Sequence, residues 1–419
     1  MNIDPEKLFK KLFKKFVNEG DPCKLVIKNL PKKPQKKIFV VGVGKASFKM
    51  AMGVEKKWGT VDGIILTTHK SNKKFKKIKT FIGSHPKPSL DNFNVTKKIC
   101  EKLENLNSND FVLFLISGGG SSLLCYPKKN LLFKDKQSVH EELVKNGISI
   151  KEINIVRKHL SNVKGGQLAT YAYPCEMMSL IISDVPGDKL SDISSGPTIG
   201  ETSTNLDAIS IIKKNKINVS KNVLLVLNKK SSVINPKDIR LKNIQNHLIG
   251  NFYNSYLEVK KWIGKNNFNI HFLGDDIEGE AKKIGIEQAK IAKKLQYEMK
   301  EKSKPILLIS GGECTVRLTQ NGNGGPNQEF VLSALIELNG HPNISVMACD
   351  TDGIDGNSKM AGAFATPKTL KNSFNKGLNP KEFLEKNNST EFFKKIGNTI
   401  VTGPTNTNIN DLRVFYIKF

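Results

Sequence analysis

Short apolar runs alternate along this chain with stretches of helical periodicity. The apolar runs predict strands at residues 38–42, 63–67, 111–116, 178–183, 223–227, 268–273, 305–309, 315–319 and 344–348. Helical periodicity predicts helices at residues 46–57, 92–106, 253–264 and 279–299. Because strands that alternate with helices build parallel sheets covered on both faces, we predict an α/β fold. A chain of 419 residues has room for two or three domains, and we place a boundary near residue 240.

The first seventeen residues have the pattern of an amphipathic helix. Its apolar face consists of Leu8, Phe9, Leu12, Phe13 and Phe16. This segment lacks the apolar centre of a signal peptide, and it carries Asp4 and Glu6 and no arginine, unlike a transit peptide. No apolar stretch approaches the roughly 18 residues that a membrane helix needs. We therefore expect a cytoplasmic enzyme without a membrane partner.

Glycine-rich turns follow three of the predicted strands. They are Gly42-Val43-Gly44-Lys45, Ser117-Gly118-Gly119-Gly120-Ser121-Ser122 and Ser310-Gly311-Gly312-Glu313. Ligands of open α/β sheets bind at the carboxyl ends of the strands, where backbone N–H groups at helix starts favour anions. Three such turns predict an enzyme that handles phosphate.

Lys45 stands where a lysine can neutralise a phosphate or a developing oxyanion. The turn is not a Walker A motif, because Phe39 and Ala46 occupy the positions that need Gly and Ser or Thr. The alternative is a tight turn followed by a surface lysine.

The turn at Ser117, Gly118, Gly119, Gly120 and Ser121 is the candidate phosphate or nucleotide site. Its glycines let a ligand approach the backbone, and its hydroxyls can bond to phosphate oxygens. A nucleophile elbow is excluded because Leu123 stands where that motif needs glycine. The alternative is a flexible turn.

Arg157 is one of only four arginines, and its planar fork binds carboxylate or phosphate bidentately. The alternative for Arg157 is a structural ion pair. Asp184 and Asp352 each follow a predicted strand, where a carboxylate can bind magnesium or accept a hydroxyl proton. The alternative for both aspartates is a structural role as a helix cap or turn residue. The alternative for His85, a lone histidine in a loop, is a structural hydrogen bond.

The net charge of +27 raises the alternative of nucleic-acid binding. The charge is dispersed and almost entirely lysine, so we expect no nucleic-acid partner. None of the six cysteines forms a C-x-x-C pair, which argues against a zinc site and a disulfide framework.

Taken in order, these segments resemble the glycerate 2-kinase family, whose C-terminal part is called the MOFRL domain. The matching segments are Gly42–Ala46, Gly83–Pro86, Ser117–Ser122, Arg157 with Lys164-Gly165-Gly166, Ser183–Gly187, Ser195–Thr198, Ser310–Val316, Gly325–Glu329, Thr351–Gly356 and Gly403–Asn408. They extend over nearly the whole chain.

The resemblance implies ATP- and Mg²⁺-dependent phosphorylation of D-glycerate to 2-phosphoglycerate. It implies an N-terminal doubly wound, Rossmann-like parallel sheet in residues 1–240, a smaller C-terminal α/β MOFRL domain in residues 241–419, and an active site in the cleft between them. Lys45, Arg157 and Asp184 are then the catalytic residues, with Asp184 and Asp352 as metal ligands. Substrate-binding or accessory roles fall to His85, Lys164, Glu313, Asn327, Glu329, Thr405 and Asn408. We expect a monomer or homodimer.

One position departs from the family pattern. Many members have arginine where this chain has Pro326, so Arg317 or a nearby lysine is the candidate to replace that charge. Two alternative activities remain, a kinase of another small hydroxy acid and a hydroxypyruvate reductase. The reductase needs a dinucleotide fingerprint, and Ser47 stands in place of its third glycine.

Overall fold

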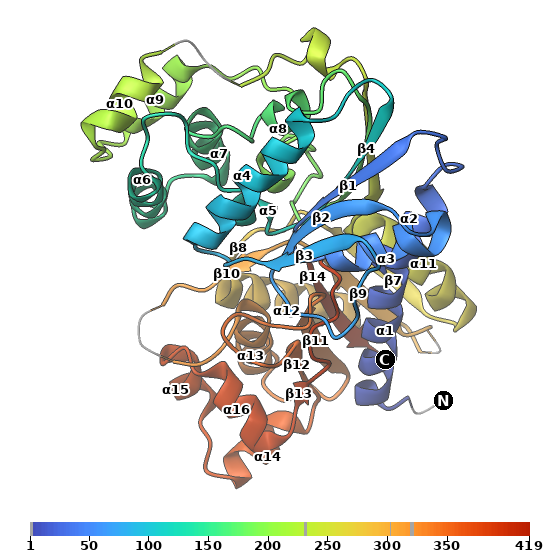
Figure 1. The fold of residues 1–419 in the computed structure, drawn as a ribbon. Helices are drawn as coiled ribbons and strands as arrows, with labels where there is room; N and C mark the ends of the chain where they lie inside the picture. Colours follow the sequence, from blue (N-terminus) through green and yellow to red (C-terminus); the bar gives the residue numbers. More distant parts are fainter. Residues whose placement is uncertain (1–2, 230–232, 302, 319–321) are drawn as a thin grey trace. The chain divides into compact units, whose positions relative to one another are not determined.

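The computed structural model describes residues 3–229, 233–301, 303–318 and 322–419, which form two compact units (Figure 1). The first unit comprises Pro22–Asp184 and Asp188–Gly250. The second comprises the segment that ends at Asp21, Val185–Gly187 and Asn251–Phe419. Each unit is built on its own six-stranded sheet with helices, so the predicted α/β class is confirmed.

The sheet of the first unit is parallel throughout. Its strands are β1 (Lys37–Val43), β2 (Asp62–Thr67), β3 (Ile78–Ile82), β4 (Asp110–Ile116), β5 (Glu176–Ile182) and β6 (Ile244–Gly250). They lie in the order β3-β2-β1-β4-β5-β6. This is the order of a doubly wound sheet, in which the direction of winding reverses between β1 and β4. Every residue of β4 is buried, as expected for a central parallel strand.

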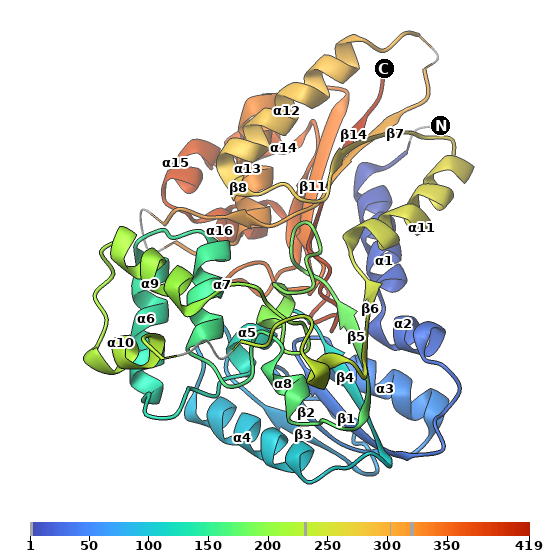
Figure 2. The ribbon, with the colours of Figure 1, turned by 90° about the horizontal axis from the view of Figure 1, so that it is seen from above.

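Helices cover both faces of this sheet, as Figures 1 and 2 show. Helix α3 (Ser47–Trp58) packs on β1 and β2 and against α2 (Pro22–Asn29), whereas α4 (Leu90–Glu104) packs on β2 from the other side. The helices predicted at 46–57 and 92–106 are therefore confirmed. Ser89 caps α4 by accepting a hydrogen bond from the Asn92 amide, which sets where that helix begins.

A group of helices with its own apolar core completes the first unit. It contains α6 (Phe133–Lys145), α7 (Ile150–His159), α9 (Asn205–Lys214) and α10 (Lys221–Leu227). Shorter segments are α5 (Gly120–Leu123), α8 (Gln167–Thr170) and the 3₁₀ turns Ile193–Ser195 and Ile239–Leu241. The predicted strand at 223–227 is wrong, because this run forms α10. Only Val223 and Leu227 are buried there, four residues apart on one helical face, and a short apolar run does not distinguish the two structures.

The sheet of the second unit is mixed. Its strands are β7 (Asn269–Gly274), β9 (Ile306–Ser310), β11 (Ile344–Asp350), β12 (Gly362–Ala365), β13 (Thr399–Ile400) and β14 (Asp411–Ile417), in the order β13-β12-β11-β14-β9-β7. Of the strand pairs that the structure describes in this sheet, β7 with β9 is parallel and the other four are antiparallel. A separate small pair joins β8 (Gly279–Glu280) to β10 (Cys314–Thr315). The strand predicted at 315–319 is thus wrong for 316–318, which are not in a strand, and residue 319 lies outside the described residues.

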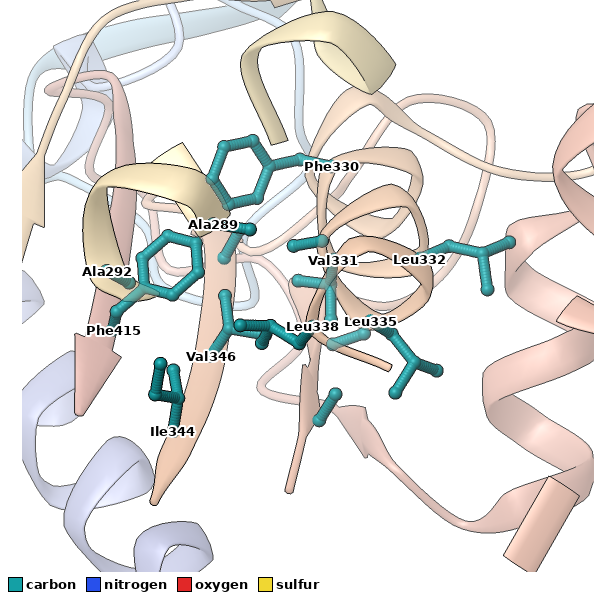
Figure 3. Close-up of a cluster of buried hydrophobic side chains, with 14 of the residues drawn as sticks. Ala289, Ala292, Phe330, Val331, Leu332, Leu335, Leu338, Ile344, Val346 and Phe415 are labelled. Atoms are coloured by element: carbon teal, nitrogen blue, oxygen red, sulfur yellow. The ribbon is translucent and has the colours of Figure 1, made fainter. Parts of the chain in front are cut away.

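Helices α12 (Ala281–Tyr297) and α13 (Pro326–Leu338) pack on each other and on this sheet, and Figure 3 shows their shared core around Phe330, Val346 and Phe415. The remaining helices are α1 (Pro5–Glu19), α11 (Phe252–Lys265), α14 (Thr369–Asn375), α15 (Pro380–Glu385) and α16 (Ser389–Ile396). All five apolar residues predicted on one face of α1 are buried. The Phe16 ring lies 4.7 Å from that of Phe252, so α1 is anchored on α11.

Candidate functional site

Two sequence-predicted turns meet where the winding of the first sheet reverses. Val43, at the end of β1, pairs in register with Ile116 at the end of β4. The Lys45 amide donates to the Gly118 carbonyl at 2.8 Å, and the Ala46 amide donates to Ser117 Oγ at 3.0 Å. Because ligands of doubly wound sheets bind in the crevice at this reversal, the two turns form the candidate site of the first unit.

Three charged or titratable side chains surround the glycine turn. A Cβ placed on Gly119 would lie 3.2 Å from both Lys45 Cγ and His85 Cδ2, and one on Gly118 would overlap the Asp184 carboxylate. Gly119 also has φ of 81°, which favours glycine. The structure therefore brings together Lys45, His85 and Asp184, which are far apart in sequence.

The turn has the backbone geometry of an anion-binding nest. Within the described part of the chain, the amides of Gly118, Gly119 and Ser121 donate no hydrogen bond. Successive amides left without acceptors beside a left-handed residue form a concavity suited to phosphate oxygens. This arrangement supports the phosphate-binding role predicted for this turn.

Two residues beside the same turn have strained backbones. Ser194 and Ser195 have φ of 53° and 61°, values that are uncommon for residues with a side chain. Ser194 Oγ donates to the Ser117 carbonyl at 2.8 Å, and the hydroxyls of Ser195 and Ser121 lie 2.8 Å apart. Strained residues persist where their surroundings hold them, often at functional sites, and these two brace the glycine turn.

Arg157 and Lys164 face one small cavity at the edge of the turn. Arg157 lies in the last turn of α7, and Lys164, which is 1% exposed, donates from Nζ to the Ser121 carbonyl at 2.7 Å. Both line a cavity together with Ser121. Burial lowers the pKa of Arg157 to about 10 and lowers that of Lys164 well below its usual value. The same cavity is lined by Lys136 and His140, which the sequence analysis missed because α6 was not predicted.

Arg413 supports the glycine turn of the second unit. It is 1% exposed and donates to the carbonyls of Gly311 (3.2 Å) and Gly312 (3.1 Å) and to Asp411 Oδ2 (3.0 Å). By fixing these carbonyls, Arg413 sets the turn that presents the exposed side chain of Glu313. The available sequence signal was a rare arginine within an otherwise apolar run near the C-terminus.

Asn327 and Glu329 point into the interior of the second unit from the first turn of α13. Asn327 Nδ2 donates to Asp411 Oδ1 at 2.7 Å and to Asp355 Oδ1 at 3.2 Å. Glu329 Oε2 accepts a hydrogen bond from Asn387 at 3.1 Å, and burial raises the pKa of Glu329. These contacts support accessory, positioning roles for both residues.

Asp352 and Thr405 lie in two loops that pack against each other. The Thr405 amide donates to the Asp352 carbonyl at 2.9 Å, and Thr405 Oγ1 donates to the Thr351 carbonyl at 2.6 Å. Asp352 Oδ1 accepts from the Ile354 amide at 2.8 Å. Asn408, in the second of these loops, is 6% exposed. The structure thus places three predicted site residues in one loop pair of the second unit.

The residues present fit a metal ion carried by a nucleotide rather than a cage of protein ligands. Among the described residues, no group of three His, Cys, Asp or Glu side chains is arranged to hold an ion. Magnesium is usually held by one or two carboxylates together with substrate phosphates. Asp184, directly beside the amides of the glycine turn, provides such a carboxylate.

Asp355 caps α13 from inside the second unit, and this predicts a pH-dependent stability. It accepts from the amides of Asn327 (2.9 Å) and Gln328 (2.8 Å), and burial raises its pKa to about 7. A carboxyl group with a raised pKa contributes stability that is full below its unfolded value near 4 and is lost as the pH rises through 7. The unfolding free energy of the native protein minus that of Asp355→Asn should therefore fall by about 2 kcal/mol between pH 5 and pH 8. Denaturant titrations of both proteins measure it, and a difference that grows with pH would contradict this account.

Comparison with known proteins decides the family. Residues 8–228 match a family model described as a domain of unknown function (DUF4147), and residues 306–411 match that of the MOFRL family. The D-glycerate 2-kinase of Thermotoga maritima is 36% identical over 416 residues, 98% of each chain. The chain belongs to the glycerate 2-kinase family. The glycerate 2-kinase of Pyrococcus horikoshii is 35% identical, over 90% of this chain and 86% of that one.

A solved structure and a differently named relative complete the comparison. The crystal structure of the glycerate kinase from Thermotoga maritima superposes with a TM-score of 0.88 at 35% identity, covering 99% of both chains. A relative from Agrobacterium vitis, 37% identical over 99% of this chain and 95% of its own, bears the name putative hydroxypyruvate reductase. The family resemblance stated from the sequence motifs is confirmed.

Pro326 has a local structural explanation within this family fold. It occupies the first turn of α13, where proline is well tolerated because the missing N–H has no partner within the helix. Arg317, proposed to replace the charge of the frequent arginine, is exposed, and its carbonyl accepts from Asn387 at 3.3 Å. In the described parts of the chain, no helix has the length and apolarity to span a membrane.

Proposed function

We propose that this protein transfers the γ-phosphoryl group of ATP to D-glycerate and forms 2-phosphoglycerate. The observation that carries the proposal is the grouping of Lys45 and Asp184 around the amide-lined turn Ser117–Ser121, at the switch point of a parallel sheet. Membership of the glycerate 2-kinase family supports both the reaction and the substrate.

Each residue around the turn has a proposed role that matches its placement. Phosphoryl transfer depends mainly on positioning and on neutralising charge. The amides and hydroxyls of Ser117–Ser121 bind phosphate oxygens of ATP, Lys45 neutralises the transferred group, and Arg157 holds the anionic acid. Asp184 or Asp352 would hold Mg²⁺, and a second carboxylate would accept or orient the proton of the C2 hydroxyl. Mg²⁺ supplies neutralisation of phosphate charge when bound.

The remaining predicted residues stay proposals with supporting roles. We infer substrate-binding or accessory functions for His85, Lys164, Glu313, Asn327, Glu329, Thr405 and Asn408. The cytoplasmic location, the monomeric or homodimeric state and the absence of a nucleic-acid partner likewise stay predictions.

The proposal predicts release of ADP that depends on D-glycerate. Purified protein with ATP and Mg²⁺ should release ADP at least a hundredfold faster with D-glycerate than without acceptor, because bound substrate completes the site. A pyruvate kinase–lactate dehydrogenase couple measures this rate. Equal rates with and without D-glycerate would contradict the proposed reaction, and a faster rate with another small hydroxy acid would favour the kinase alternative.

The name of the Agrobacterium vitis relative supports one further candidate, reduction of hydroxypyruvate. Ser47, three residues after Gly44, stands in the place of the third glycine of a dinucleotide fingerprint. Its hydroxyl donates to the Gly44 carbonyl at 2.7 Å. We therefore expect no oxidation of NADH or NADPH with hydroxypyruvate. Oxidation at the rate of ADP release would establish the reductase instead.

A further inference from the structure

A small cavity beside the glycine turn is lined by several basic side chains, two of which, Lys136 and His140, have no role in the proposed reaction. Lys136 and His140 lie one turn apart on one face of α6, and Arg157 and Lys164 approach from α7 and the segment after it. Ser121, from the glycine turn, lines the same cavity. The first unit thus places three basic side chains and an imidazole around one space next to the proposed phosphate site.

These cations lack the counter-charges that buried cations normally have. Within the described ranges, no carboxylate forms an ion pair with Lys136, Arg157 or Lys164. Lys158, on the same helix as Arg157, shows the usual arrangement. It is 2% exposed and pairs with both Glu201 and Asp192. Burial of these unpaired bases is costly and lowers their pKa values, so an anionic ligand would stabilise the cluster in its charged form.

Two polar atoms in the cavity lack a hydrogen-bond partner among the residues that the structure describes. They are Lys136 Nζ and His140 Nδ1, and both atoms are buried. Lys164 Nζ, by contrast, is fixed on the Ser121 carbonyl at 2.7 Å, which ties the cavity to the glycine turn. Burial, together with Arg157 and Lys164, lowers the pKa of His140 to about 4, so its imidazole is neutral at physiological pH. A neutral imidazole beside cations can bond to a hydroxyl group.

We propose that this cavity binds the carboxylate group of the acid substrate, held by Lys136, Arg157 and Lys164, with His140 contacting a substrate hydroxyl. This assignment rests on the proposed kinase reaction for the identity of the acid. It makes Lys136 a specificity-determining residue that distinguishes an acid from a neutral polyol.

The size and position of the cavity favour a carboxylate over the phosphates of the nucleotide. Its volume is about 30 Å³, whereas one water needs roughly 10–15 Å³, so it holds a group of a few atoms and not a polyphosphate chain. Because Ser121 lines the cavity and belongs to the glycine turn, a carboxylate bound here leaves the adjacent carbons of a three-carbon acid close to that turn.

The test replaces Lys136 by Met, which removes its charge and keeps its length. We expect KM for D-glycerate to rise at least tenfold and KM for ATP to change less than twofold. The preference of the enzyme for D-glycerate over glycerol, which lacks the carboxylate, should fall by a similar factor. Because one of three repelling cations is removed, the melting temperature without ligand should not fall. Lys134→Met, an exposed lysine of the same helix, is the matched control and should leave all these values unchanged.

A binding measurement separates this proposal from the kinase proposal. D-glycerate without ATP should raise the melting temperature of the native protein and of Lys134→Met, but not that of Lys136→Met or Lys136→Gln. Inorganic phosphate and glycerol at the same concentration should have little effect. If no ADP is released but this binding pattern holds, the reaction is wrong and the carboxylate site stands. If the native enzyme is active and the Lys136 variants keep the native KM and thermal shift, or if phosphate stabilises as well as D-glycerate, the carboxylate site is wrong.

Discussion

Replacing Lys45 with Met is expected to lower kcat about 1000-fold, which corresponds to roughly 4 kcal/mol of transition-state stabilisation. Lys45 follows the buried strand β1, its stem lies beside Gly119, and its amide is bonded to the Gly118 carbonyl. Its side chain thus starts from a rigid backbone position beside the glycine turn. Fixed positive charges at such a place contribute factors of about 10²–10³ or more, because they need no rearrangement during the reaction.

The effect should appear in catalysis and not in folding. The Lys45→Met protein should melt within a few degrees of the native protein, since the amide contacts that hold the turn remain. Lys56→Met, an exposed lysine on helix α3, which begins just after Lys45, is the control and should keep native turnover. Steady-state kinetics with ATP and D-glycerate measure both variants. A Lys45→Met enzyme with turnover within tenfold of native would remove Lys45 from the mechanism.

Asp184→Asn should have the second largest effect, a fall in kcat of about 100-fold at a fixed Mg²⁺ concentration. The side chain keeps its size, so the close packing against Gly118 is preserved while the negative charge is lost. Removal of a metal-holding charge should also raise the Mg²⁺ concentration for half-maximal activity at least tenfold, because carboxylate oxygens are the preferred ligands of this ion.

Magnesium titrations of activity distinguish the two roles proposed for Asp184. Asp91→Asn, an exposed carboxylate in the first turn of α4, serves as the control and should behave like the native enzyme. If Asp184→Asn lowers kcat but leaves the Mg²⁺ requirement unchanged, Asp184 does not hold the metal and acts on the hydroxyl proton instead. Native activity in this variant would exclude it from both roles.

The parallel sheet and its switch point were largely accessible from the sequence. Buried parallel strands are continuous apolar runs, which predict where β1, β4 and β5 lie. Each of these strands is followed by a glycine or aspartate motif, which marks where the strand ends. The run at 223–227 misled because five consecutive apolar residues fit a helix and a strand equally. β3 and β6, edge strands with exposed positions, gave too weak a pattern to be predicted.

The residues that sequence reasoning missed depend on tertiary contacts. Lys136 is an ordinary lysine in a lysine-rich helix until α6 and α7 bring it to the same cavity as Arg157. Asp355 looks like a third carboxylate of an acidic loop, yet its oxygens accept from the first amides of α13, a helix that begins 29 residues earlier in the chain. The pattern of apolar and polar residues locates helices, strands and turns. The pairing and burial of charged side chains depend on contacts between elements that are distant in the sequence.

The most direct test of the account is the position of the transferred phosphoryl group. Native protein is incubated with ATP, Mg²⁺ and D-glycerate, and enolase is added without phosphoglycerate mutase, so that only 2-phosphoglycerate yields phosphoenolpyruvate. The account predicts phosphoenolpyruvate in proportion to the ADP formed, and its loss in Lys45→Met. ADP formed with D-glycerate but without phosphoenolpyruvate, or no ADP at all, would contradict the proposal that this site phosphorylates the C2 hydroxyl of D-glycerate.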